Sequence, residues 1–398
     1  YNALQSPYYN DSHRKLRAFV RGYLEKHVVP VIKEWEESGE VPLEEIVRWA
    51  RSGLAFQDMP EKYRPGIGLP AAIPENEWDI FHFIILHQEI AHVGYIGCLG
   101  GGSVIGAPPV VNHGNEEQRE RWLPGIFTGE TRFCLGATEP SGGSDLANLK
   151  TTAEKTLDGR FYIVNGHKKW ISGALVSTHM TTAVRTGGPG AKGVSVLVIP
   201  LDLPGISPRK IKNSGANAAG SAWVTLDNVK VPAENLIGRE NHGFAYLMTK
   251  RFLMCATMNS YARVCLEDAW AYAMDRHTFG QPLFAHQLAT MARYIESHWA
   301  WIEQIAYHIK ATGGISPELS SRIALCKVQG GRLLELANRE AQQIFGGNGY
   351  QRGGIGGRVE QISRDLRMSI VGGGSEEIIT DLAVRQEMKQ AKARGSKL

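Results

Sequence analysis

Residues 135–150 read LGATEPSGGSDLANLK, and residues 165–173 read NGHKKWISG. The first stretch combines small residues, hydroxyl groups and backbone N–H groups, and the second offers an aromatic ring followed two residues later by a hydroxyl. Gly142 and Gly143 would let backbone amides approach a pyrophosphate, Ser144 could donate to it, and Trp170 offers a face for stacking. The two stretches therefore predict a site for a ligand that has phosphate groups and a flat ring.

Short predicted strands surround these two stretches. Four runs rich in β-branched and aromatic residues follow one another without helical periodicity: FYIVNG from 161, THMTTAVRT from 178, VSVLVIP from 194 and AWVTLDNVKV from 222. This pattern predicts a compact antiparallel sheet or barrel. The segment GPGAKG at 188–193 matches GxGxxG, but it joins a strand to a strand rather than to a helix, so we interpret it as a hairpin turn.

Helical periodicity flanks the strands on both sides. Before them, apolar residues recur on one face between Leu16 and Val28, with Asp11 or Ser12 as the expected cap. Further helices are expected over 43–50, 78–93, 116–122, 252–276, 288–310 and 322–343, and after the break at 372–374. The sequence thus predicts an α+β fold with a helical N-terminal domain over 1–132, a middle antiparallel β-barrel-like domain over 133–242 and a C-terminal four-helix bundle over 243–398.

The composition argues against several classes of function. The formal net charge is +4 and basic residues alternate with acidic ones, so we expect no nucleic-acid partner. No apolar run approaches the roughly 20 residues that span a bilayer, so we do not expect a membrane protein. The 5 cysteines are scattered without a CxxC pair. His82, His87 and His92 are each turned by roughly 140° from the last on a helix, so we expect no metal site.

The stretches quoted first resemble the flavin-binding core of the acyl-CoA dehydrogenase family, whose pattern runs TEP, two small residues and GSD, then a strand that ends in W-I-T or W-I-S. DRHTFG at 275–280, with His286 and Gln287 following, resembles the arginine-containing helix end of that family. QIFGGNG at 343–349 resembles its second flavin motif, and VPAENLIG and SRDLRM match as well. The resemblance covers nearly the whole chain.

The resemblance implies FAD as cofactor. In that family, the counterparts of residues 135–144 and 170–172 line the isoalloxazine and the pyrophosphate, with Ser172 near the flavin N5. The counterparts of 276–278, 286–287 and 343–347 touch the FAD of a neighbouring subunit, which implies a homo-oligomer, a tetramer or a dimer. The cofactor-binding residues carried over are Leu135, Ala137, Thr138, Ser144, Trp170, Ile171, Ser172, Arg276, Thr278, Phe279, His286, Gln287, Gln343, Gly346, Gly347, Ser375 and Glu377.

The catalytic base of the family has no counterpart in this sequence. Family enzymes remove an α-proton from a thioester with a carboxylate while hydride passes to the flavin. Most members carry this Glu near the C-terminus, where the present chain has Gly373, and others carry it immediately before the residue that corresponds to Arg251, where this chain has Lys250. Two explanations stay open: a true deletion, or a connecting segment missing from the sequence as given. Glu377 is expected in the first turn of the last helix rather than as a base.

The implied partners follow from the same resemblance. Ser144, Arg251 and the backbone at Gly373 would contact an acyl thioester presented by CoA or by a carrier protein. The electron acceptor is an electron-transfer flavoprotein or oxygen. The leading function is FAD-dependent dehydrogenation of an acyl thioester in fatty acid metabolism. The alternatives are a flavin oxidase or monooxygenase on the same fold and a flavin-binding relative without catalysis.

The last three residues, Ser396-Lys397-Leu398, spell a peroxisomal import signal, provided that Leu398 is the true C-terminus. A peroxisomal location is the expectation, and a mitochondrial or cytoplasmic one is the alternative.

Overall fold

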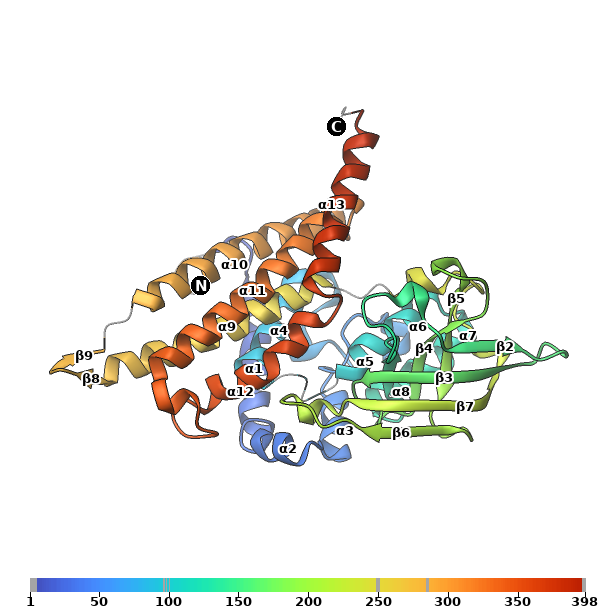
Figure 1. The fold of residues 1–398 in the computed structure, drawn as a ribbon, viewed down its shortest axis with the longest axis horizontal. Helices are drawn as coiled ribbons and strands as arrows, with labels where there is room; N and C mark the ends of the chain where they lie inside the picture. Colours follow the sequence, from blue (N-terminus) through green and yellow to red (C-terminus); the bar gives the residue numbers. More distant parts are fainter. Residues whose placement is uncertain are drawn as a thin grey trace. The chain divides into compact units, whose positions relative to one another are not determined.

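A computed structural model describes residues 6–95, 97, 99, 101–247, 251–283 and 286–395. The chain divides by its internal contacts into two compact units. Residues 1–32, 73–96 and 250–398 form one, here called the helical unit, and residues 33–72 and 97–249 form the other, the sheet unit (Figure 1). The three sequence domains stay a prediction, and each unit is described by itself.

The helical unit is a bundle of long helices. Figure 1 shows α9, α10 and α11 running side by side. Apolar side chains from four helices, among them Phe81, Phe252, Trp299 and Ile323, form one buried cluster between them. The elements of this unit are α1 (Asp11–His27), α4 (Ile80–His92), α9 (Arg251–Asp275), β8 (His277–Thr278), β9 (Gln281–Pro282), α10 (His286–Thr312), α11 (Ser320–Phe345), α12 (Gly357–Val371) and α13 (Glu376–Ala393).

The starts of α1 and α4 are capped in the same way. Asn10 and Asp79 each accept a hydrogen bond from a backbone N–H in the first turn, and the imidazoles of His13 and His82 accept in return from the N–H of the cap residue. The two rings stack with centroids 3.8 Å apart. Asp11 and Ser12, expected as caps, already lie inside the helix, because Asn10 is the residue with extended backbone angles.

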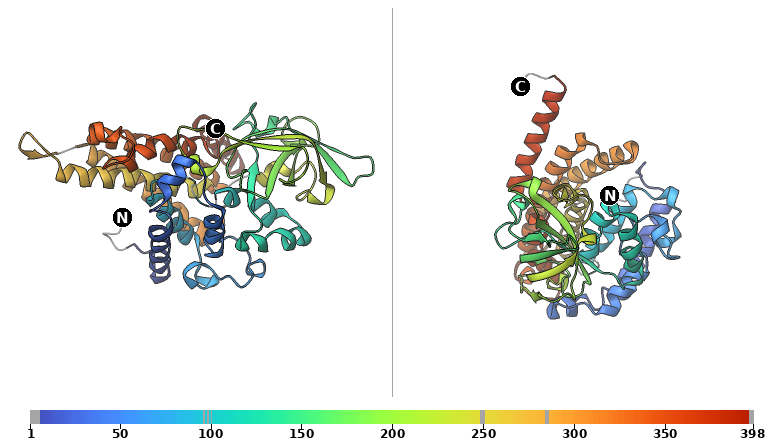
Figure 2. Two further views of the ribbon diagram at one scale, coloured as in Figure 1. Left: turned by 90° about the horizontal axis from the view of Figure 1, so that it is seen from below. Right: turned by 90° about the vertical axis from the view of Figure 1, so that its right-hand side faces the viewer.

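The sheet unit is a seven-stranded sheet with short helices. Figure 2 shows the strands and these helices in two further views. Trp122 and Phe127 from the helices pack with Val194 and Val196 of the sheet in one buried cluster, and a second cluster is built from strand residues. The elements are α2 (Ile32–Ser38), α3 (Leu43–Arg51), α5 (Gly101–Gly106), α6 (Pro108–His113), α7 (Glu116–Trp122), α8 (Pro124–Thr128), β1 (Phe133–Gly136), β2 (Thr152–Lys155), β3 (Phe161–Ile171), β4 (His179–Arg185), β5 (Val194–Pro200), β6 (Ile206–Lys210) and β7 (Ala222–Pro232).

The strand order is β1-β4-β2-β3-β7-β6, with β5 paired to β4. Four of the pairs are antiparallel, as expected, and the segment 188–193 is the turn between β4 and β5. Two pairs are parallel. Strand β4 pairs with β1, and it also pairs with β2 at one position, where Thr152 lies opposite Arg185. Within the described residues, no helix is both long enough and apolar enough to cross a membrane.

The bundle core yields a stability prediction for α11. Leu334 is fully buried, whereas Leu325 on the same helix is 39% exposed. We expect Leu334→Ala to lower the free energy of unfolding by about 2–5 kcal/mol, because it leaves a cavity in the core. Leu325→Ala should cost less than about 1 kcal/mol in the same denaturant titration. Equal losses for the two variants would contradict this packing.

Candidate functional site

The loop after β1 begins with a tight turn, and the residues that follow this turn are exposed to solvent. The Glu139 N–H donates to the Gly142 carbonyl over 3.0 Å, and the Gly142 N–H donates back over 3.2 Å. The Gly142 amide, expected to face a pyrophosphate, is therefore used inside the turn. Gly143 and Ser144 are exposed, and a side chain at Gly143 would meet nothing within 4 Å. Gly143 is thus the glycine of this loop that a ligand can approach closely.

Trp170 adopts a strained backbone conformation at an irregularity in β3. The pairing of β3 with β7 shifts register between Lys168 and Ile171, and the φ angle of Trp170 is +61°. A bulky side chain rarely adopts positive φ, and such outliers cluster at functional sites. The Trp170 ring is 49% exposed, with the Lys169 ammonium 4.3 Å from its centroid. The ring therefore offers an aromatic surface near the C-terminal end of β3.

Hydrogen bonds bring the β1 loop and Trp170 together. The Lys169 N–H donates to the Thr138 carbonyl over 3.0 Å, and the Thr138 hydroxyl donates to the Lys169 carbonyl over 2.5 Å. Ala137 is buried beside them, Leu135 is half-buried on β1, and Ser172 is half-buried after the strand. The structure thus places the predicted residues of 135–144 and 170–172 in one part of the sheet unit. Their roles stay predictions.

In the helical unit, two cations hold the chain reversal between α12 and α13. The Arg251 Nε donates to the Gly373 carbonyl over 2.8 Å. The Lys327 ammonium donates to the Ile370 carbonyl and, over 2.8 Å, to the Gly374 carbonyl. Burial lowers the pKa of both cations, that of Lys327 to about 8. The two cations satisfy the Ile370 carbonyl in the last turn of α12 and the Gly373 and Gly374 carbonyls in the turn that follows.

Gly373 lies in this reversal with its amide open. Its φ angle is +68°, and within the described residues its N–H donates no hydrogen bond to the backbone. No carboxylate in that part of the chain is hydrogen-bonded to Arg251 or Gly373. Glu376 pairs with Arg332, and Glu377 is exposed in the first turn of α13, where its own backbone N–H and the Ser375 side chain lower its pKa. The predicted base position at Lys250 lies outside the described residues.

Most of the other predicted cofactor-binding residues lie at the end of the bundle that is far from Arg251. The rings of Tyr272 and Phe345 stack with centroids 4.6 Å apart, so the ends of α9 and α11 lie together. Thr278 and Gln287 are half-buried there, and Phe279 is fully exposed with a φ angle of +53°. The others are all exposed: Arg276, His277, His286, Gln343, Gly346 and Gly347. Since α9 has 25 residues, about 37 Å separates this group from Arg251.

His13, Asp79 and His82 offer ligand atoms within 4.8 Å of one another, a grouping that the sequence did not predict. The His13 Nε2 and His82 Nδ1 atoms lie 3.0 and 3.1 Å from the same Asp79 oxygen, and the Lys310 ammonium lies 2.7 Å from the other oxygen. A cation would compete with that ammonium and with two helix N-termini. His87 instead contacts Thr257, so the three histidines of α4 do not converge.

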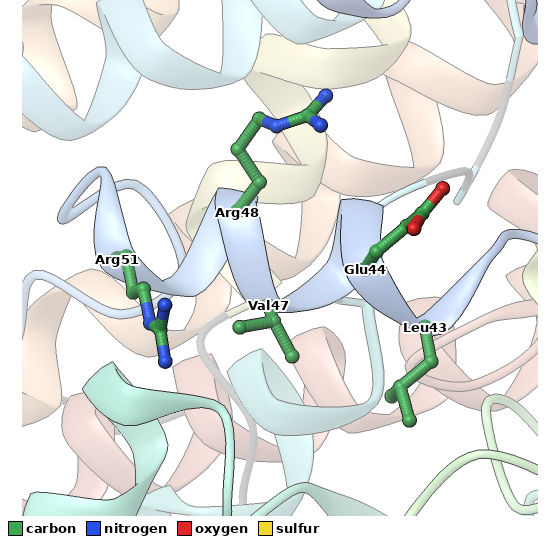
Figure 3. Close-up of a pocket in the computed structure, with 5 residues that line it drawn as sticks. All are labelled: Leu43, Glu44, Val47, Arg48 and Arg51. Atoms are coloured by element: carbon green, nitrogen blue, oxygen red, sulfur yellow. The ribbon is translucent and has the colours of Figure 1, made fainter.

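The surface of α3 carries a shallow pocket of about 550 Å³ (Figure 3). Its lining comes from this one helix, and Arg48 is already paired with Glu45 over 2.7 Å. None of the predicted site residues lines it. The pocket is lined by Leu43, Glu44, Val47, Arg48 and Arg51.

Sequence reasoning missed Lys168 and Lys327, which are both buried. Lys168 follows Tyr162 and Val164 in the buried phase of β3, and a lysine in phase with core residues is a signal that could have been used. Lys327 lies between Cys326 and the buried Gly330 on α11, but its carbonyl partners come from a distant segment. Only the folded chain reveals that contact.

The conformation of Gly373 yields a second prediction. A Cβ atom there would lie 3.0 Å from the Met254 sulfur, in addition to the strain of positive φ. We expect Gly373→Ala to lower the free energy of unfolding by about 1–3 kcal/mol. Gly357→Ala, where a Cβ meets nothing within 4 Å and φ is ordinary, should change it by less than about 0.5 kcal/mol. Thermal unfolding of both variants measures this, and a neutral Gly373→Ala would contradict the described turn.

Three models of acyl-CoA dehydrogenase domains match the chain. The N-terminal domain model matches residues 10–130, the middle domain model 134–229 and the C-terminal domain model 241–388.

Relatives named acyl-CoA dehydrogenase match over nearly the whole chain. One from Alternaria alternata is 44% identical, covering 96% of this chain and 92% of its own length, and one from Emericella nidulans is 37% identical, covering 99% and 95%. The first alignment runs over 402 positions but includes 96% of 398 residues here, so that relative has residues without a counterpart in this chain.

Solved acyl-CoA dehydrogenase structures share the fold. One from Geobacillus kaustophilus has a TM-score of 0.87 at 28% identity, and a probable one from Mycobacterium abscessus has 0.86 at 30% identity. Each alignment covers 96% of this chain and 100% of the solved chain. These matches show the helical N-terminal, curled-sheet and helical C-terminal fold of that family. The chain therefore belongs to the acyl-CoA dehydrogenase family of flavin-dependent enzymes.

Proposed function

We propose that this chain binds FAD and dehydrogenates an acyl thioester between its α- and β-carbons. The observation that carries the flavin site is the exposed, strained Trp170 beside the open loop at Gly143 and Ser144. An aromatic face next to accessible backbone and hydroxyl groups suits a ligand with a flat ring and a pyrophosphate. Leu135, Ala137, Thr138, Ile171 and Ser172 would complete the cradle. Bound FAD would supply the acceptor for the hydride that leaves the substrate.

The chain's own residues would orient the thioester. The open N–H of Gly373 would donate to the thioester carbonyl, and a hydrogen bond there stabilises the charge that develops when the α-proton leaves. Arg251 holds the peptide that follows, through the Gly373 carbonyl, and so restricts the orientation of this residue. By the family resemblance, Ser144 would also contact the substrate. We assign no base, since neither Gly373 nor Lys250 carries a carboxylate.

A homo-oligomer is part of the proposal. Arg251 and Gly373 lie at one end of α9, while Arg276, Thr278 and Phe279 follow its other end, about 37 Å away. Since Arg251 and Gly373 would hold the thioester beside one flavin, a group so far away suits contact with a second flavin better than with the same one. The group at the far end, which includes Gln343, Gly346 and Gly347, would then reach the FAD of a neighbouring subunit. Ser375 and Glu377 would contact FAD from the start of α13.

The missing carboxylate favours a second candidate. A chain that keeps the flavin cradle but has neither usual base would bind FAD without desaturating a thioester, or would use the flavin as an oxidase or monooxygenase with oxygen as acceptor. For the dehydrogenase, the electron acceptor would be an electron-transfer flavoprotein. The substrate would be carried by CoA or by a carrier protein.

One experiment separates these candidates. The full chain is titrated with FAD and then mixed anaerobically with acyl-CoAs of several chain lengths, while the absorbance of the oxidised flavin is followed. We expect FAD to bind and at least one acyl-CoA to bleach it, because hydride transfer to flavin needs no oxygen. FAD binding without bleaching by any thioester would contradict the dehydrogenase function and would favour a flavin-binding protein without catalysis. Peroxide release on admission of air would favour the oxidase.

We also propose a peroxisomal location, which rests on Ser396-Lys397-Leu398 at the end of the given sequence. These residues lie outside the described part of the chain. A fluorescent protein fused before the natural chain, with the C-terminus free, should collect in peroxisomes. Deletion of the last three residues should leave it in the cytosol, and an unchanged distribution would overturn the proposal.

A further inference from the structure

Glu139 and Lys168 form an ion pair inside the sheet unit. The Lys168 ammonium lies 2.7 Å from the Glu139 carboxylate, and the two residues are 0% and 2% exposed. The same carboxylate accepts hydrogen bonds from the backbone N–H groups of Lys150, over 2.6 Å, and Thr151, over 2.9 Å. The carboxylate therefore has three donors from two other segments of the chain.

The pair stays charged at neutral pH. Burial alone would raise the pKa of Glu139, but the charge and hydrogen bond of Lys168 lower it to about 2. Burial lowers the pKa of Lys168 to about 8, even though Glu139 opposes that shift. Removing two charges from water is costly, and well-packed apolar residues often serve stability equally well. A contribution to stability therefore does not by itself explain why the pair lies at this place in the fold.

The pair lies where the two halves of the proposed flavin cradle meet. Glu139 opens the tight turn that ends at Gly142 and presents Gly143 and Ser144. Lys168 precedes the strained Trp170 by two residues, at the point where β3 loses register with β7. The pair thus links the β1 loop, the start of β2 and the irregular end of β3.

We propose that the Glu139–Lys168 ion pair is a positioning clamp that holds the Gly143–Ser144 loop and the Trp170 ring in the relative geometry that FAD requires. This inference rests on the proposed function, because it assumes that FAD occupies this cradle. FAD would present a flat ring to one of these surfaces and a pyrophosphate to the other, and fixing both surfaces before binding lowers the entropy lost on association. Strain such as that at Trp170 persists only where the surroundings hold it.

The test uses the full chain and a double substitution. Glu139→Gln with Lys168→Met removes both charges at nearly constant volume, whereas either change alone leaves a buried charge or its partner unpaired. The matched control is Val231→Ala. Val231 is fully buried in β7 and pairs with Tyr162, eight residues before Trp170 on β3, so this change weakens the same sheet away from the cradle.

FAD affinity is measured by quenching of flavin fluorescence, well below the unfolding transition of each protein, and the visible circular dichroism of bound flavin reports its environment. We expect the double variant to bind FAD at least tenfold more weakly than the wild type and with altered dichroism. Val231→Ala should stay within threefold of the wild type, although it unfolds at a lower temperature.

Each other result has a defined meaning. If the wild type binds FAD and the double variant binds it equally well, the proposed positioning role of the ion pair is wrong, but the proposed flavin site is retained. Equal loss of affinity in Val231→Ala would assign the effect to general stability and overturn the clamp, as would a double variant that does not fold. If the wild type binds no FAD, the proposed function falls and the clamp with it.

Discussion

A lysine ammonium buried away from water must find oxygen atoms, and this requirement shapes a chain reversal in each unit. Lys168 meets the Glu139 carboxylate in the sheet unit, and Lys327 meets the carbonyls of Ile370 and Gly374 in the helical unit. In both places burial lowers the pKa of the lysine to about 8. Because an unpaired buried charge costs several kcal/mol, each segment that supplies the oxygens is bound firmly to the core.

The strained positions of the site lie next to these two lysines. Trp170 has a φ angle of +61° two residues after Lys168, and Gly373 has one of +68° between the two carbonyls that Lys327 holds. Positive φ costs a tryptophan free energy, whereas glycine adopts it readily. Trp170 in the sheet unit therefore needs a stronger constraint from its surroundings than Gly373 does in the helical unit. The Glu139–Lys168 ion pair, together with the two backbone N–H groups that donate to Glu139, supplies that constraint.

Local patterns predicted the elements of this fold, and contacts between distant segments went unpredicted. Runs rich in β-branched and aromatic residues indicated β3, β4, β5 and β7. The strands β4 and β5 are buried on both faces, whereas β3 and β7 alternate between buried and more exposed residues. The short strands β1, β2 and β6 and the parallel pairing of β1 with β4 were missed, since register depends on partners far along the chain. Helix α12 follows the glycine-rich segment 353–357 and gave no clear start signal. The flavin motifs could be recognised in the sequence, but the buried ion pair of Glu139 and Lys168 beside them could not.

The geometry at Gly373 bears on where a base can stand. A side chain at this position would press against the Met254 sulfur 3.0 Å away, and its peptide is already fixed by Arg251. A carboxylate at this position would require the Met254 side chain to shift and would carry the strain of positive φ. The turn thus suits a family member whose base comes from elsewhere, and the residue before Arg251 is the position that family resemblance offers. Whether this chain has a catalytic base therefore depends on the residues that precede α9.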